Sequence, residues 1–147
     1  MTTYAATGNK DVPVEAFVAP QDKVDSHMYL SIHSYDPYNF VHDNSGTNSD
    51  GSTYDYNIKI WDESCEAVID GVFARLDKRS KKFGMPFLLG EFGSGDVKKA
   101  VAERIKYANY LNKKFKEYKT TGLVWMGFLD RKSLTWSETE VLDAMMK

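Results

Sequence analysis

Three apolar segments, each followed by a segment with helical spacing of apolar residues, constrain the fold of this chain more than any other feature. The apolar segments span residues 28–35, 86–91 and 122–127. The first alternates between apolar residues and polar or aromatic ones, a period of two that is typical of a strand. Strands that alternate with helices form a parallel sheet with right-handed crossovers. The sequence therefore predicts an α/β fold.

The helical segments follow the strands in order. The first is predicted from about residue 58 to 79 and the second from about 96 to 118, because apolar residues recur three and four positions apart. Cys65 lies on the apolar stripe of the first helix, so we interpret it as a small core residue. A last helix is predicted to begin at Ser137, because the spacing from Ser137 to Glu140 fits a capping box.

Composition excludes several classes of protein. The chain has 147 residues, a formal net charge of −2 and a single cysteine. The near-neutral charge argues against a nucleic-acid binder, and one cysteine excludes an internal disulfide framework. No apolar run approaches the roughly 20 residues that cross a bilayer, and residues 1–4 lack the features of a signal peptide. Aromatic residues make up 14 % of the chain, which indicates either core packing or a surface for flat ligands such as sugars.

Four side chains of possible chemical function lie at the carboxyl ends of the predicted strands. They are His33, Tyr35, Glu91 and Trp125, and active sites of α/β enzymes occupy this edge of the sheet. Taken singly, these residues also fit ordinary structural roles: a salt-bridged glutamate, core packing for the histidine and the tyrosine, and a buried tryptophan. We expect all four to face one cavity, with His33 and Tyr35 donating hydrogen bonds to the Glu91 carboxylate.

Segments around these residues resemble glycoside hydrolase family 5, and most closely its bacterial endo-β-1,4-glucanases (cellulases). The likeness in order and spacing is to strands six, seven and eight of the family's (β/α)8 TIM barrel, and residues 1–8 are similar to the stretch that leaves strand five. The resemblance implies that residues 1–147 form the carboxyl-terminal half of a barrel, a partial catalytic domain without its amino-terminal half. The segments that carry it are Ile32–Phe40, Pro86–Gly93, Gly122–Trp125 and Leu129–Trp136.

The resemblance also implies a role for each residue. Glu91 matches the nucleophile of a retaining glycosidase, His33 and Tyr35 match the residues that orient it and contact the sugar, and Trp125 matches the tryptophan that stacks beneath that sugar. Retaining hydrolysis uses two carboxyl groups about 5 Å apart. The family's acid/base glutamate lies in an Asn-Glu-Pro motif, and no Asn-Glu pair occurs in this chain. We therefore expect the complete protein to hydrolyse cellulose-type β-glucan, and the isolated chain to be weakly active or inactive.

The charge balance and the lack of a long apolar run argue against a nucleic acid or a membrane as partner. The resemblance implies a β-glucan polysaccharide or oligosaccharide as partner. It implies no metal or organic cofactor, because two carboxyl groups suffice for the reaction. Asp43, Asp50 and Asp55 lie in or beside a polar loop, but their spacing does not fit a calcium loop. A parent cellulase is expected outside the cell, where its polymeric substrate is found.

Two other functions also fit these residues. The chain could be a non-catalytic module that binds sugar or mediates assembly, or its family 5 parent could act on mannan, xylan or xyloglucan. Strands cut from a barrel leave open edges and an exposed inner face, which we expect to carry Phe87, Leu89 and Leu123. We therefore expect a homo-oligomer, or pairing with a complementing amino-terminal half.

Overall fold

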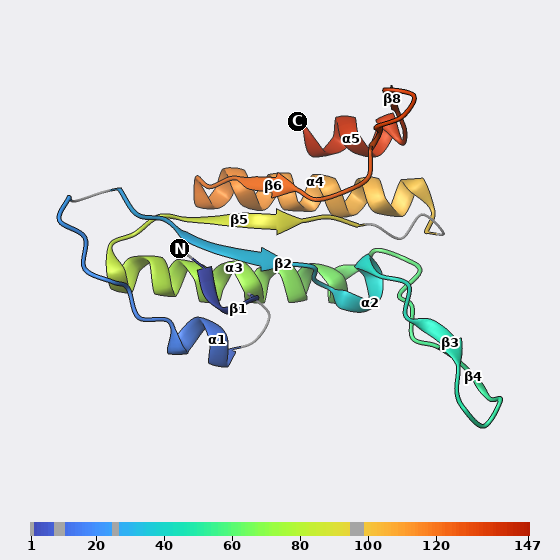
Figure 1. Ribbon diagram of the computed structural model, residues 1–147, viewed down its shortest axis with the longest axis horizontal. Helices are drawn as coiled ribbons and strands as arrows, with labels where there is room; N and C mark the ends of the chain where they lie inside the picture. Colours follow the sequence, from blue (N-terminus) through green and yellow to red (C-terminus); the bar gives the residue numbers. More distant parts are fainter. Residues whose placement is uncertain (1, 8–10, 25–26, 95–98) are drawn as a thin grey trace.

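The computed structural model describes residues 2–7, 11–24, 27–94 and 99–147 (Figure 1). Its main sheet has four strands in the order β1–β2–β5–β6, and every neighbouring pair is parallel. This arrangement confirms the predicted α/β fold with a parallel sheet. The sheet is open in the described part of the chain and does not close into a barrel. Its strands are β1 (Thr2–Thr7), β2 (Leu30–Ser34), β5 (Phe87–Phe92) and β6 (Gly122–Val124).

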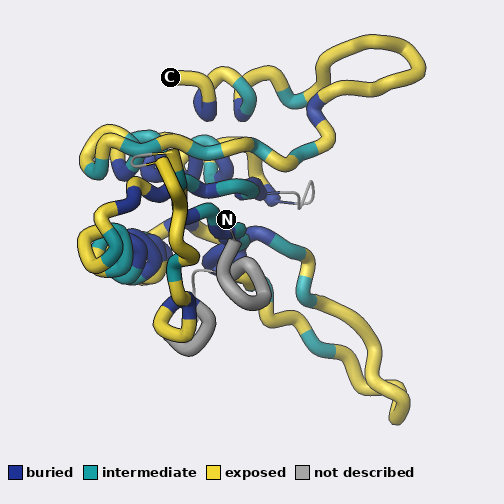
Figure 2. Tube along the Cα trace, turned by 60° about the vertical axis from the view of Figure 1, so that its left-hand side comes forward, coloured by how far each residue is buried: buried dark blue, intermediate teal, exposed yellow. Residues whose placement is uncertain are grey.

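Five helices and two antiparallel hairpins complete the described structure. Figure 2 shows both hairpins as largely exposed chain that projects from the body of the protein. None of the described helices combines the length and the apolar character needed to span a membrane. The helices are α1 (Asp11–Ala16), α2 (Tyr38–Val41), α3 (Glu63–Phe83), α4 (Val101–Tyr118) and α5 (Thr139–Met145), and the hairpins pair β3 (Ser45–Thr47) with β4 (Thr53–Asp55) and β7 (Leu129–Asp130) with β8 (Thr135–Trp136).

Local capping sets the ends of α3 and explains why the predicted boundaries, 58 and 79, are wrong. The Asp62 carboxylate accepts hydrogen bonds from the backbone N–H groups of Ser64 and Cys65, so the helix begins only after Asp62. Gly84 adopts the left-handed conformation, with φ 63°, and the helix continues until that residue stops it. The predicted start of the next helix near Asp96 lies outside the described residues, and α4 itself begins at Val101.

The helices α3 and α4 pack against one face of the sheet. The Phe73 ring of α3 lies 6.0 Å from Phe87, and the Phe115 ring of α4 lies 5.3 Å from Phe92. Cys65 is buried as predicted, and burial raises the pKa of its thiol, which argues against a reactive role. The strand side chains that this helical layer buries are Leu30, Ile32, Phe87, Leu89 and Phe92.

The opposite face of the sheet is open, and its composition corrects one prediction. Phe87 and Leu89 were expected there but face the helices, because this side of each strand supplies the apolar contacts of α3 and α4. Leu123 is 64 % exposed, as expected for the open face. Gly122 and Val124 alternate with it toward the helices, since a Cβ at Gly122 would meet the Phe115 and Phe92 rings.

The predicted capping box at Ser137 is also wrong. The helix α5 begins at Thr139, and its N-cap residue is Glu138 in a left-handed conformation, with φ 50°. The Glu138 carboxylate instead binds the fully buried guanidinium of Arg104 through two hydrogen bonds of 2.6 and 2.7 Å. A buried guanidinium needs a counter-charge, so this tertiary ion pair decides the geometry at the start of α5. The Ser137 hydroxyl donates to the Phe128 carbonyl oxygen at 3.2 Å.

Candidate functional site

The site candidates from β2 and β5 meet because these strands are parallel neighbours. Their carboxyl ends therefore lie at the same edge of the sheet, to the right in Figure 1. His33 is the penultimate residue of β2 and Tyr35 directly follows that strand, while Glu91 is the penultimate residue of β5. The chain thus brings residues more than fifty positions apart to one place on the open face.

A β-bulge at Gly90 turns Glu91 toward this open face. Ile32 pairs with Leu89, but the next residue of β2, His33, pairs with Glu91, so Gly90 is an extra residue in β5. Strict alternation from the buried Leu89 would place Glu91 on the helix side. The extra residue reverses the alternation and brings the Glu91 side chain beside His33.

Gly90 is a glycine because its neighbours leave no room for a side chain. A Cβ at this position would collide with the Ser31 hydroxyl oxygen and would lie 3.3 Å from His33 Cδ2. Glycines inside strands commonly mark such bulges and close approaches. The Gly90-Glu91 pair therefore combines the carboxylate with the backbone feature that orients it.

One oxygen of the Glu91 carboxylate interacts with both candidate partners. The Tyr35 hydroxyl donates a hydrogen bond to Glu91 Oε2 at 3.1 Å, and His33 Nδ1 lies 3.2 Å from the same oxygen. The Glu91 and His33 side chains are 30 % and 35 % exposed, so the cluster remains accessible. The structure thus brings together three of the four predicted site residues.

The environment of Tyr35 keeps its hydroxyl protonated. Burial raises the pKa of Tyr35 to about 12, and the hydrogen bond and negative charge of Glu91 act in the same direction. A protonated phenol beside a carboxylate can only donate to it, which restrains the carboxylate rotamer. Tyr35 is therefore a hydrogen-bond donor to the Glu91 carboxylate.

The Tyr35 ring also contacts His42, which sequence reasoning did not single out. The centroids of the Tyr35 and His42 rings are 5.3 Å apart, and those of His42 and Tyr38 are 4.8 Å apart. The short helix α2 positions His42, because its single turn brings His42 over Tyr38 and the His42 backbone N–H donates to the Tyr38 carbonyl oxygen at 3.0 Å. In the sequence, the only indication of the contact between Tyr35 and His42 was the high proportion of aromatic residues in positions 35–42.

Trp125 lies at the end of the neighbouring strand β6. Its backbone N–H donates to the Phe92 carbonyl oxygen at 2.7 Å, which places it beside the residue that follows Glu91. The Trp125 residue is 65 % exposed, so its indole is accessible to a ligand. The structure places Trp125 next to the end of β5. That Trp125 shares one cavity with His33, Tyr35 and Glu91 stays a prediction.

The cluster has the elements of nucleophilic chemistry. A carboxylate that faces an open surface, oriented by a tyrosine hydroxyl and an imidazole, can attack an electrophilic carbon. Within the described ranges, no group of three or more His, Cys, Asp or Glu side chains is placed to hold a metal ion.

Known proteins that match this chain include a cellulase/esterase and an endoglucanase. Cellulase/esterase CelE of Acetivibrio thermocellus is 30 % identical over 157 residues, an alignment that covers 99 % of this chain and 18 % of that protein. Endoglucanase A of Ruminococcus albus is 26 % identical, over 100 % of this chain and 40 % of its own length. The chain thus spans well under half the length of these two relatives.

Solved structures that match this chain include an endoglucanase and a lichenase. A GH5-4 broad specificity endoglucanase from Ruminococcus champanellensis with bound cellotriose superimposes with a TM-score of 0.77 at 26 % identity, covering 99 % of this chain and 42 % of that one. A glycoside hydrolase 5 lichenase from Caldicellulosiruptor sp. F32, in complex with cellotetraose, has the same TM-score and identity over 94 % of this chain and 40 % of its own. The family model described as cellulase (glycosyl hydrolase family 5) matches residues 2–128, so the chain belongs to glycosyl hydrolase family 5.

Proposed function

We propose that this chain is the carboxyl-terminal part of the catalytic domain of a retaining endo-β-1,4-glucanase, with Glu91 as its nucleophile. The observation that carries the proposal is the double contact to Glu91 Oε2, from the Tyr35 hydroxyl at 3.1 Å and His33 Nδ1 at 3.2 Å. The position of this cluster at the carboxyl end of a parallel sheet supports it, since barrel enzymes carry their active sites there.

The reaction assigned to Glu91 has two steps. The carboxylate attacks the anomeric carbon and forms a glycosyl ester, while the bond to the leaving oxygen breaks and an acid protonates that oxygen. Water then cleaves the ester. The second carboxyl group, which acted as the acid in the first step, now acts as a base and removes a proton from the water. The chain has no Asn-Glu pair, so we assign the second carboxyl group to the remaining part of the protein.

The neighbouring residues have distinct roles in this proposal. Tyr35 and His33 hold the Glu91 carboxylate in one rotamer and lie close enough to contact the sugar at the cleavage point. Trp125 provides an exposed ring on which the C–H face of a pyranose can stack. These roles need no metal ion or organic cofactor.

Cellulose-type β-glucan is the substrate that the relatives favour. Two matched relatives are named cellulase and endoglucanase, and two structural neighbours hold cellotriose and cellotetraose. One structural neighbour is named a broad specificity endoglucanase and another a lichenase, so further β-glucans are candidates as well. Because such polymers do not enter cells, we also propose that the complete enzyme acts outside the cell.

Covalent trapping with 2,4-dinitrophenyl 2-deoxy-2-fluoro-β-cellobioside tests the proposal on this chain. Dinitrophenolate departs without protonation, so the first step does not need the second carboxyl group. The fluorine slows hydrolysis of the ester, so the adduct accumulates. We expect mass spectrometry of proteolytic fragments to find the fluorocellobiosyl group on Glu91.

Two variants make the trapping experiment decisive. Glu91→Gln should abolish labelling, because an amide is a poor nucleophile, whereas Glu140→Gln, at an exposed position of α5, should label at the unsubstituted rate. A label on another carboxylate, or none on folded chain that binds cellobiose, would refute the assignment of Glu91.

A further inference from the structure

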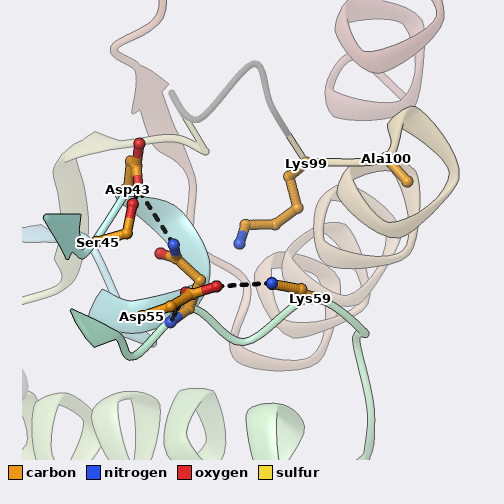
Figure 3. A pocket seen from close by; sticks show the side chains of 7 residues that line it. Asp43, Ser45, Asp55, Lys59, Lys99 and Ala100 are labelled. Carbon is orange, nitrogen blue, oxygen red and sulfur yellow. Dashed lines mark hydrogen bonds and ion pairs between the residues drawn. The ribbon is translucent and has the colours of Figure 1, made fainter. Parts of the chain in front are cut away.

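A polar cavity lies between the β3–β4 hairpin and the start of α4 (Figure 3). Its volume is about 400 Å³, within the range of roughly 300–1,000 Å³ that is typical of small-molecule sites. The hairpin follows β2 and α2, and α4 follows β5. The cavity is therefore built from the two segments that continue β2 and β5, the strands of the Glu91 cluster, and it lies beyond the same carboxyl-end edge of the sheet (Figure 1).

Hydrogen bonds fix the acidic wall of the cavity. Asp43 Oδ1 accepts from the Ser45 hydroxyl at 2.5 Å and from Asn57 Nδ2 at 3.0 Å. Asn57 Oδ1 in turn accepts from the backbone N–H of Asn44 at 2.7 Å. Asp55 Oδ2 accepts from Lys59 Nζ at 2.7 Å. These groups are oriented before any ligand arrives, which reduces the entropy lost on binding.

Lys99 forms the other wall. Its side chain is largely buried, Nζ donates to the Ile58 carbonyl oxygen at 2.7 Å, and the ammonium lies 5.1 Å from the centre of the Phe40 ring. Figure 3 shows the Lys59 and Lys99 side chains pointing toward the side of the cavity that carries Asp43 and Asp55. The ammonium of Lys99 is thus held in place by its contacts with Ile58 and Phe40.

Charge indicates what kind of ligand the cavity can take. Among its described lining residues, the carboxylates of Asp43 and Asp55 balance the ammonium groups of Lys59 and Lys99. A site without net charge favours neither a free cation nor a free anion. It does offer fixed donors and acceptors together, which match sugar hydroxyl groups because each hydroxyl both donates and accepts.

We propose that this cavity, called here the hairpin cavity, is a subsite that binds a neutral pyranose unit of a β-glucan chain whose other units lie at Glu91. The inference rests on the proposed function, since the same polymer must reach both places. According to this inference, the β3–β4 hairpin contributes to the recognition of oligosaccharides that extend beyond the Glu91 cluster.

Titration with cello-oligosaccharides, followed by the amide resonances of the chain, tests the subsite. We expect cellohexaose to shift the amides of Ser45, Asn57 and Ala100 together with those near Glu91, and cellobiose to shift them less. Lys59→Met removes a lining ammonium from a side chain that is 71 % exposed, so the fold should tolerate it. We expect this variant to bind cellohexaose about five times more weakly, the effect of losing one hydrogen bond.

Lys81→Met is a matched control. Lys81 pairs with Asp77 at 2.6 Å and Lys59 with Asp55 at 2.7 Å, both pairs are four residues apart, and the Lys81 side chain is 76 % exposed. Lys81 lies on α3 and does not line the hairpin cavity, so its substitution should leave cellohexaose affinity unchanged.

The outcomes separate this inference from the proposed function. Shifts confined to His33, Glu91 and Trp125, or equal affinities for the Lys59 and Lys81 variants, would overturn the subsite while leaving the Glu91 assignment intact. No shift with any oligosaccharide would also overturn the subsite. Covalent trapping on the unsubstituted chain, measured in parallel, reports on the Glu91 assignment alone.

Discussion

Replacing Gly90 with alanine tests how the bulge of β5 positions Glu91. The added Cβ would collide with the Ser31 hydroxyl oxygen and would press on His33, with Cδ2 at 3.3 Å and Nε2 at 3.5 Å. Overpacking of this kind typically destabilises a protein by about 1–3 kcal/mol. Rotation of the Ser31 hydroxyl can relieve part of the clash, so we expect Gly90→Ala to lower the free energy of unfolding by about 1–2 kcal/mol.

The same substitution should also slow covalent trapping at Glu91. The imidazole of His33 must move by a few tenths of an ångström, and a 1 Å displacement in an active site can reduce the rate about 100-fold. On that scale we expect labelling to be about three to ten times slower. Gly127→Ala is the control, because a Cβ at Gly127 meets no atom within 4 Å.

A second substitution identifies the source of the clash. Ser31→Ala removes the hydroxyl and should restore most of the stability lost in Gly90→Ala, giving a coupling energy above about 0.5 kcal/mol between the two positions. Urea unfolding followed by tryptophan fluorescence measures the stabilities, and mass spectrometry measures the labelling rate. Unchanged stability and unchanged labelling in Gly90→Ala would refute the reasoning, and so would additive effects of the two substitutions.

Four further predictions concern the site, the ion pair and the edges of the sheet. Tyr35→Phe removes a hydrogen bond to a charged group and should slow labelling of Glu91 about 10- to 100-fold, whereas unchanged labelling would exclude a positioning role. Trp125→Ala removes an exposed ring, so fluorescence titration should show cellotetraose binding about three to ten times weaker with unchanged unfolding by urea. The hydrogen bonds and charge of Arg104 lower the pKa of Glu138, so this pair stabilises the chain above the ordinary glutamate value of about 4.3 and stops doing so as the pH falls through the lowered pKa. Glu138→Gln should therefore lower the free energy of unfolding by about 3 kcal/mol at pH 7 and by much less at pH 3, measured with urea at both values. The open sheet edges should cause association, and a stable monomer of 16.7 kDa in light scattering across a dilution series would contradict that expectation.

The sequence by itself determined the order of strands and helices and the edge of the sheet where the site lies. Local hydrophobic periodicity is sufficient for this, because alternation in residues 28–35 and helical spacing in 58–79 each reflect which side of one element is buried. Parallel connection then places the ends of β2 and β5 together. The contact among Glu91, His33 and Tyr35 could be anticipated for that reason.

Only the tertiary structure decided how the backbone turns Glu91 toward the open face. Alternation alone would have directed it to the helices, and the bulge at Gly90 depends on the close approach of Ser31 and His33 from the neighbouring strand. The same holds for Glu138, where pairing with the buried Arg104 prevailed over a local capping motif. A local pattern records the preference of one element, whereas bulges, buried ion pairs and the hairpin cavity depend on contacts between elements distant in the chain.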